Sequence, residues 1–326
     1  MKTEIIERLL CLLDVRMHAL ALCEVSRGTR LKLPAMEAVM VHYVLRGQGV
    51  LRSDDGAKVD FGPDSLLYLP PGCSHEIAET GDEPELIVWK DIATPVGDGM
   101  MKFADGGDPV IINACGTITA DCEGLDLFSG LRESIVVSLA GDPCVRSAFE
   151  IMIKELQGPR FGTKPLLEAL MKQCLILSLR NQAERGELLL FPLLGGGDPR
   201  LVQALLELLE DPAREHTVEE LAAASGMSRS LFSERFSEAF DRPPMDLLKQ
   251  IRLHRAASLL RATNLPVQVI GLTVGYVSRS YFSRAFKSAY GRDPRTFRDE
   301  ARAQRPVQKT DSSTISGGAD HAGETI

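Results

Sequence analysis

The strongest constraint on this chain is a nine-residue pattern that occurs twice, fifty positions apart. Ser228–Phe236 reads Ser-Arg-Ser-Leu-Phe-Ser-Glu-Arg-Phe, and Ser278–Phe286 reads Ser-Arg-Ser-Tyr-Phe-Ser-Arg-Ala-Phe. Each copy follows an apolar helical segment and a glycine, Gly226 or Gly275, and the turn from glycine to serine is one residue longer in the second copy. A serine in that place is a good helix N-cap, because its hydroxyl accepts from the free N–H groups of the first turn. The repeat therefore predicts two helix-turn-helix units.

The second helix of each unit has two distinct faces. Phe232 and Phe236, like Phe282 and Phe286, are four residues apart and share one face, which we expect to be core. The opposite face carries side chains suited to base edges and phosphates. A polar helix face is commonly only a solvated face, but two copies with matched caps and aromatic spacing favour DNA contact. The predicted DNA-binding residues are Arg229, Ser230, Ser233, Glu234, Arg279, Ser280, Arg284 and Lys287.

From Asp198 to Arg298 the chain resembles the DNA-binding domain of the AraC/XylS family of bacterial transcription regulators. The motifs that carry the resemblance include Thr-Val-Glu-Glu-Leu-Ala-Ala-Ala-Ser-Gly-Met-Ser from Thr217 and Gly-Arg-Asp-Pro-Arg-Thr-Phe-Arg from Gly291. Two positions depart from the family pattern. Gly271 stands where alanine is usual, and Asp241 stands before the long helix where glycine is usual, so Asp241 is expected to need a left-handed conformation.

The charge of the chain is segregated. The net charge is −8, but from Gly226 to Arg305 there are 15 Lys and Arg against 7 Asp and Glu, a net of +8, which leaves −16 for the remainder. A basic module on an acidic body suits electrostatic steering to DNA and discourages indiscriminate binding.

Composition and termini exclude several other classes. The N-terminus has acidic residues where a signal peptide has basic ones, and no run of about 18 apolar residues is long enough to span a bilayer. The seven cysteines lack Cys-x-x-Cys spacing, which favours reduced thiols in a cytoplasm over a disulfide framework. We expect a cytoplasmic protein with no membrane association.

The N-terminal half is predicted to be rich in strands after a short helix over 4–13. Short β-like runs separated by turn residues suggest a sandwich or barrel. The expected strands are 21–25, 38–45, 49–52, 65–69, 85–90 and 109–112.

Two stretches sharpen this prediction. Val41–Gly49, followed by the run from Phe61 to His75, resembles a cupin, specifically the cupin-like N-terminal domains of AraC-family regulators, over about residues 1 to 190. Enzymatic cupins hold a metal through three histidines and a glutamate. Only His42 and His75 stand near those places here, so we expect no metal and no cofactor. The two histidines are either satisfied barrel residues or part of a site for a small organic effector.

Two helices are expected after the strands, over 142–157 and 163–182. The segment from Leu166 to Leu179 is apolar around most of its circumference and must be covered on several sides. The pair either forms internal core or supplies the seam of a homodimer, as a helix pair does in the regulators that this chain resembles.

The overall expectation is an α+β chain of two domains. A cupin-like β-barrel with its helix pair occupies 1–190, a glycine-rich linker 191–197 with Gly195-Gly196-Gly197, an all-α double helix-turn-helix domain 198–305, and a disordered tail 306–326. The long helix from Met245 to Leu260 is expected to separate the two recognition helices.

Four cysteines are candidates for a redox signal: Cys23, Cys73, Cys115 and Cys122. A cysteine near a histidine or at a loop edge is expected to have thiolate character and therefore to react with oxidants. Some cupin-type regulators of the resembled family respond to oxidants. The alternative is that these cysteines are small apolar residues packed in the barrel.

The sequence thus predicts a transcription regulator that binds double-stranded promoter DNA, forms a homodimer, contacts RNA polymerase if it activates, and responds to a small-molecule or redox signal. It is not expected to be an enzyme. The main rival is a metal-dependent cupin oxygenase or isomerase with a fused DNA-binding module. An architectural nucleoid protein is disfavoured by the acidic N-terminal half.

Overall fold

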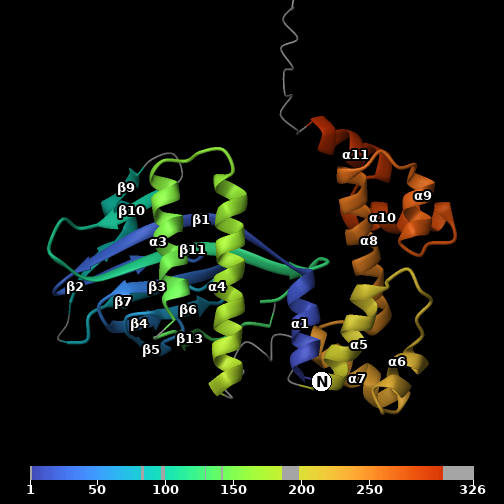
Figure 1. Cartoon of the computed structure of the whole chain (residues 1–326), viewed down its shortest axis with the longest axis horizontal. Coiled ribbons are helices and arrows are strands. Elements are labelled where there is room, and N and C mark those ends of the chain that lie inside the picture. The colour runs from blue at the N-terminus through green and yellow to red at the C-terminus, as the bar shows by residue number, and fades with distance from the viewer. Residues whose placement is uncertain are drawn as a thin grey trace, which may run out of the picture. The chain divides into compact units, whose positions relative to one another are not determined.

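The computed structural model describes residues 2–81, 84–96, 100–128, 130–140, 142–185 and 198–303, with side chains from Glu7 onward. The chain divides into two compact units, Met1–His254 and Arg255–Ile326. The division falls inside α8 (Pro244–Ala262), the helix between the two predicted helix-turn-helix units (Figure 1). The expected linker 191–197 and tail 306–326 lie outside the described residues, so the proposed domain boundaries stay a prediction.

The first unit begins with α1 (Lys2–Leu12) and continues as strands with one short helix, α2 (Trp89–Ile92). Because α2 starts at Trp89, the strand expected over 85–90 is shorter than predicted. Several strands of the structure, among them 29–33, 58–61, 75–78 and 135–138, were not predicted. The strands are β1 (Leu13–Ser26), β2 (Thr29–Leu33), β3 (Val39–Arg46), β4 (Gly49–Ser53), β5 (Lys58–Phe61), β6 (Ser65–Leu69), β7 (His75–Ala78), β8 (Glu85–Val88), β9 (Ala93–Val96), β10 (Met100–Ala104), β11 (Pro109–Cys122), β12 (Leu125–Asp126) and β13 (Ile135–Ser138).

The strands form two sheets in the described part of the chain. An eight-stranded sheet has the order β13-β6-β3-β11-β1-β10-β9, with β12 paired to β11, and a five-stranded sheet has the order β5-β4-β7-β2-β8. Hydrogen bonding closes neither sheet, because each path ends in two edge strands. The expectation of a cupin-like domain is confirmed, but its barrel is built of two open sheets.

The long antiparallel pair β1 and β11 forms the centre of the larger sheet. It runs from Leu13↔Cys122 to Ser26↔Pro109, far beyond the runs expected over 21–25 and 109–112. The segment directly after Ile112, Asn113 to Gly116, consists of small and polar residues that have weak strand propensity. It is held as a strand because β11 pairs with β1 on one side and β3 on the other.

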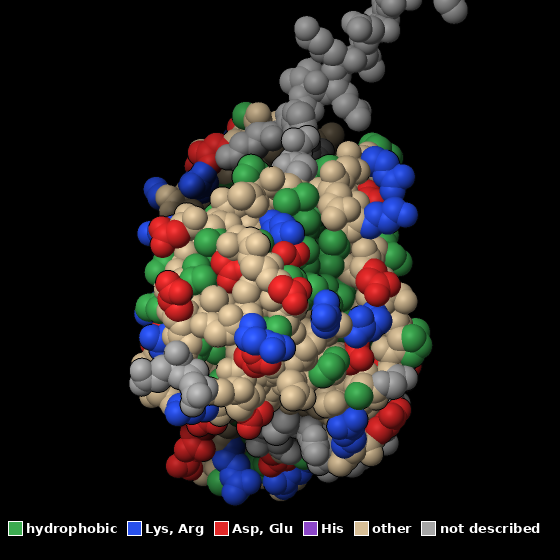
Figure 2. Space-filling model, turned by 90° about the vertical axis from the view of Figure 1, so that its left-hand side faces the viewer, with side chains coloured by type: hydrophobic (Ala, Val, Ile, Leu, Met, Phe, Trp, Pro, Cys, Tyr) green, Lys and Arg blue, Asp and Glu red, His purple; other side chains and the backbone are tan. Residues whose placement is uncertain are grey.

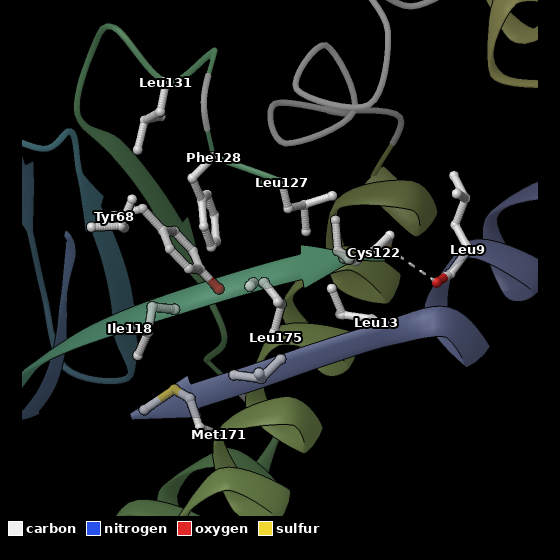
Figure 3. Close-up of a cluster of buried hydrophobic side chains, with 14 of the residues drawn as sticks. Leu9, Leu13, Tyr68, Ile118, Cys122, Leu127, Phe128, Leu131, Met171 and Leu175 are labelled. Carbon is white, nitrogen blue, oxygen red and sulfur yellow. Dashed lines mark hydrogen bonds between the residues drawn. The ribbon is translucent and has the colours of Figure 1, made fainter. Parts of the chain in front are cut away.

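Two hydrophobic clusters lie on opposite faces of this sheet. In one cluster, Met171 and Leu175 of the helix α4 (Thr163–Arg185) pack against Leu13 and Ile118 of the central strands (Figure 3). The other cluster lies between the two sheets and contains Cys23, Val44, Leu51, Leu67 and Ile77, among others. Alternate residues of β3 therefore contribute to different clusters, as the two-residue period of a strand requires.

The helix pair forms as predicted, in slightly different bounds. Helix α3 (Pro143–Gln157) begins after Asp142, whose carboxylate accepts from the Cys144 N–H at 2.9 Å. Arg146 fastens α3 to the strands by donating to Asp64 and, at 3.0 Å, to the Leu45 carbonyl. The buried face of α4 is completed by Leu167, Cys174 and Leu179.

The remaining elements are helical. The first unit continues with α5 (Pro199–Glu210), α6 (Val218–Ala224), α7 (Arg229–Phe240) and the first part of α8. The second unit holds the rest of α8, then α9 (Val267–Thr273), α10 (Arg279–Tyr290) and α11 (Pro294–Ala303). Of the helices that the structure describes, none is both long enough and apolar enough to cross a membrane.

Candidate nucleic-acid interface and buried polar cluster

The first helix-turn-helix unit is α6, a short turn and α7. Thr217 and Glu220 form a capping box at the start of α6, in which each side chain bonds the backbone N–H of the other. The turn passes through Gly226 at a φ of 63°, a conformation that glycine adopts without strain. Ser228 then caps α7 by accepting from the Leu231 N–H at 3.3 Å.

The second unit, α9 and α10, repeats this backbone. The Tyr276 N–H bonds the Gly271 carbonyl at 2.8 Å, as the Met227 N–H bonds the Ala222 carbonyl at 2.9 Å. Ser278 caps α10 through the Tyr281 N–H at 3.3 Å. The extra residue of the second turn is Val277, whose side chain is 93% exposed, so the longer turn leaves the cap unchanged.

The aromatic side chains form the core face of both recognition helices, as predicted. Phe232 and Phe236 are fully buried with ring centroids 5.4 Å apart, and Phe282 and Phe286 are fully buried at 5.8 Å. The structure explains why glycine stands at position 271, where alanine is usual in the resembled family. A Cβ there would lie 3.2 Å from the Phe282 ring, which is a tight contact.

The residue that ends α7 also confirms a prediction. Asp241 adopts the left-handed backbone conformation, with a φ of 57°. It is the C-terminal cap of α7, as Gly291 is the C-terminal cap of α10.

All eight predicted DNA-binding residues lie on α7 or α10, and all have solvent-accessible side chains. On α7, Arg229 is paired with Glu219 of α6 at 2.9 Å. On α10, Arg279, Arg284 and Lys287 make no ion pair with any residue that the structure describes. The second recognition helix therefore presents more uncompensated positive charge than the first.

The two helices also differ at one equivalent position. Glu234 on α7 corresponds to Arg284 on α10. At this position α7 presents a carboxylate that accepts hydrogen bonds, and α10 presents a guanidinium group that donates them. On the face shown in Figure 2, which lies over the strands of the first unit, Lys and Arg are interspersed with Asp and Glu. This face therefore has no excess of positive charge, unlike the segment from Gly226 to Arg305.

A second candidate site lies between the two sheets of the first unit. His42 on β3 and His75 on β7 are both buried, and their Nε2 atoms are 2.9 Å apart with the rings edge to face. Burial lowers the pKa of His42 well below its ordinary value, and the neighbouring His75 lowers it further. Burial also lowers the pKa of His75, to about 4. Both rings are therefore neutral at pH 7, and one donates to the other.

Several buried polar atoms of this buried polar cluster make no hydrogen bond of good geometry with any residue that the structure describes. They are Nδ1 of His42, Nδ1 of His75 and both amide atoms of Asn113 on β11. Asn113 lies beside His42 and favours its protonation, but too weakly to offset burial. Buried polar atoms are nearly always paired, so this cluster is a candidate site for a polar ligand. Asn113 was not among the predicted site residues, because the strand expected there ended at Ile112.

The same interior holds two of the four candidate cysteines. The Sγ atoms of Cys23 and Cys115 are 3.1 Å apart, and Cys115 lies opposite His42 in the β11–β3 register. Cys73 and Cys122 are elsewhere: Cys73 donates to the Ser74 carbonyl, and Cys122 donates to the Leu9 carbonyl at 3.7 Å (Figure 3). The structure thus brings one cysteine pair together and leaves the other two apart.

The expected thiolate character is wrong for three of these cysteines. Burial raises the pKa of Cys23, and the neighbouring Cys115 raises it further. Burial also raises the pKa of Cys73 and raises that of Cys122 to about 12. His42, opposite Cys115 in the register, and His75, beside Cys73, are neutral, so neither stabilises a thiolate.

The donors between the sheets suit a polar ligand better than a metal ion. In the part of the chain that the structure describes, no group of three or more His, Cys, Asp or Glu is arranged to hold a metal. Two neutral imidazoles and an amide offer both donors and acceptors to a small molecule.

Comparisons with known proteins give matches in both the strand-rich and the helical part of the chain. A family model described as a cupin matches residues 4–184, more than half of the chain, and a model described as a helix-turn-helix domain matches residues 221–300. The HTH-type transcriptional regulator MtrA of Neisseria gonorrhoeae is 28% identical over 80% of this chain and 86% of its own length. A putative AraC-like transcription regulator of Streptomyces antibioticus is 29% identical over 90% of this chain and 97% of its own. The RCS-specific HTH-type transcriptional activator RclR of Escherichia coli strain K12 is 24% identical over 83% and 88%.

Proposed function

Because this chain belongs to the AraC-type helix-turn-helix transcription regulators that carry an N-terminal cupin domain, we propose that it controls promoters by reading DNA with α7 and α10. It is a DNA-binding transcription regulator. The observation that carries the proposal is the duplicated unit, in which the same caps and turn position two helices whose outer faces are polar.

We assign the outer-face residues according to their chemistry. The guanidinium groups of Arg279 and Arg284 contact guanine O6 and N7, and the Glu234 carboxylate accepts from a cytosine amine. The hydroxyl groups of Ser230, Ser233 and Ser280 bond base edges or phosphates. Arg229 and Lys287 neutralise phosphates, and Arg229 exchanges its pairing with Glu219 for a phosphate on binding.

The two recognition helices are proposed to enter successive major grooves on one face of the duplex. Such grooves recur about every 10.5 bp, so one protomer covers roughly two helical turns.

The signal is proposed to act at the buried polar cluster of the cupin domain. The unpartnered atoms of His42, His75 and Asn113 support a small polar effector that supplies the missing hydrogen bonds. The close contact of Cys23 with Cys115 supports a redox signal as the second candidate, in which oxidation joins the two thiols. The relative from Escherichia coli is named RCS-specific and an activator, and that name supports a signal-dependent role for this chain too. Cys73 and Cys122 have less support, because neither contacts another cysteine.

The protein is proposed to act as a homodimer and not as an enzyme. Ile151 on α3 and Leu166 on α4 are exposed large hydrophobic side chains, which supports a partner helix pair on this side. Against the rival metal-dependent enzyme, the described residues offer two converging histidines and no set of three ligands. If it activates transcription, the protein is proposed to contact RNA polymerase, and it is proposed to work in the cytoplasm.

The test uses genomic DNA fragments and the full-length protein. Fragments that the purified protein enriches are sequenced, and binding of the best site is then measured for wild type, Arg284→Ala and Arg16→Ala. Arg16→Ala makes the same charge change at an exposed position of the cupin domain. We expect upstream regions to be enriched and only Arg284→Ala to weaken binding. Equal binding by all three proteins would show that α10 does not read DNA.

A further inference from the structure

Both recognition helices expose a large apolar side chain at the same position. Leu231 is 39% exposed and Tyr281 is 53% exposed. Each is the third helical residue, and its own N–H is the group that the capping serine binds, at 3.3 Å in both units. The cap therefore holds both residues in the same place at the N-terminal end of the helix, the end that reaches base edges in helix-turn-helix proteins.

Neither side chain belongs to the core. The next residues, Phe232 and Phe282, point inward and are fully buried, and successive residues of a helix are about 100° apart. Leu231 lies three residues before Glu234, and Tyr281 lies three residues before Arg284. Residues at this spacing are neighbours on the helix surface, so each apolar side chain shares a face with a residue assigned to base reading.

Tyr281 is held by its surroundings. Its ring lies 5.8 Å from the ring of the buried Tyr276, which lies 5.3 Å from the ring of Phe282. A ring held in this way loses little conformational freedom when it meets a partner. A single exposed hydrophobic residue on a surface is ordinary. Here the feature recurs at equivalent positions of two helices that otherwise differ, with Glu234 in one and Arg284 in the other.

We propose that Leu231 and Tyr281 each contact the C5-methyl group of a thymine and so add a thymine to the sequence that each recognition helix reads. In the major groove the thymine methyl is the apolar group that a base edge presents, and apolar side chains select it. This inference rests on the proposed function, because it needs α7 and α10 in the groove. It adds two specificity-determining residues to the polar set.

The experiment compares thymine with uracil, which lacks only the methyl group. The full-length protein first selects a binding site from a pool of random duplexes, and each thymine of that site is then replaced singly by deoxyuridine. One replacement in each half of the site should weaken binding by wild type about fourfold, the effect of one buried methyl group. Leu231→Ala should abolish the uracil effect in one half and Tyr281→Ala in the other.

Conservative and control variants make the result specific. Leu231→Met and Tyr281→Phe keep an apolar contact and should keep the uracil effect. Val269→Ala removes an equally exposed apolar side chain from α9 and should change nothing.

Two further outcomes are distinguishable. If uracil weakens Leu231→Ala and Tyr281→Ala as much as wild type, or weakens none of them, the thymine contacts are wrong while DNA reading stands. If no duplex sequence is enriched at all, the proposed function fails, and this inference fails with it.

Discussion

The Nε2 atom of His42 lies 2.9 Å from the Nε2 atom of His75, at the centre of an interior that is otherwise largely apolar. Only a neutral ring accepts a hydrogen bond at this nitrogen, so at least one of the two histidines is unprotonated in the folded protein. Their environment makes both neutral, and this has a measurable consequence for stability.

We expect the protein to lose stability in mild acid because of this pair. The ordinary histidine pKa is 6.5, and that of folded His75 is about 4. Between these values the unfolded chain binds a proton that the folded chain excludes, so stability is full above about pH 6.5 and falls as the pH drops towards 4. A depression of this size corresponds to about 3 kcal/mol. Urea unfolding at several pH values should show a flatter profile for His75→Gln than for wild type. The exposed His18→Gln is the control, and an identical slope in all three proteins would contradict the assignment.

Asp241 and Gly291 provide a matched test of backbone strain. Both residues are left-handed at the end of a recognition helix, with φ of 57° and 72°. Asp241→Gly removes the strain of a Cβ and should raise the free energy of unfolding by up to about 1 kcal/mol. Gly291→Ala should lower it by about the same amount. Denaturant unfolding measures both, and a destabilised Asp241→Gly would show that the carboxylate, not the backbone, determines the turn.

Substitution of Arg284 should weaken DNA binding and relax base preference. Arg284→Ala removes one bidentate contact, so we expect a loss of about 1–3 kcal/mol and relaxed preference at one base position. Lys287→Ala should weaken binding to all sequences alike and make binding less sensitive to salt. Titrations of the selected site and its single-base variants at several salt concentrations distinguish the two. Identical behaviour of both variants would contradict the separation into base and phosphate contacts.

The seven cysteines should differ in reactivity according to burial. Cys11 and Cys144 are exposed, so iodoacetamide should label them first in the folded protein. Cys23, Cys122 and Cys174 are buried with raised pKa values, so they should stay unlabelled until the protein unfolds. Mass spectrometry of a labelling time course measures the order. Early labelling of Cys23 would show that the interior opens to solvent.

The redox alternative has its own test. Replacing Cys23, Cys73, Cys115 or Cys122 by serine one at a time, and following reporter transcription with oxidant, should affect the response only for the contacting pair Cys23 and Cys115. An unchanged response in every variant leaves the small-molecule effector as the signal.

The homodimer prediction depends on the exposed side of α3 and α4. The double variant Ile151→Glu and Leu166→Glu places two charges in the proposed seam, where an unpaired buried charge is strongly unfavourable. Sedimentation should show a dimer for wild type and a monomer for this variant. Leu265→Glu changes an equally exposed leucine near α9 and should stay dimeric. A monomeric wild type would remove the basis of the proposal.

Local sequence signals predicted the helical half well. Capping serines, glycine turns and aromatic residues four apart act within a few residues of each other, so α7 and α10 were predicted with their core and exposed faces correct. The left-handed conformation of Asp241 was expected from the resemblance to the AraC/XylS family, in which glycine is usual at that position.

The strand-rich half depended on partners distant in the sequence. Strand β11 continues to Cys122 because β1 and β3 flank it, although Asn113, Ala114 and Gly116 interrupt the strand-forming residues after Ile112. For the same reason the buried polar cluster was not predictable as a unit: His42, His75 and Asn113 come from three strands, and only sheet register sets which side chains meet.

What the sequence alone determined about this protein was therefore the pair of recognition helices, because their geometry is encoded in short-range contacts. What only the tertiary structure decided was the chemistry of the interior. Burial made both histidines neutral and raised the pKa of Cys23, where its expected place at the end of a strand had suggested a thiolate. A pKa responds to the polarity of everything around a group, and that surrounding exists only after distant strands have paired.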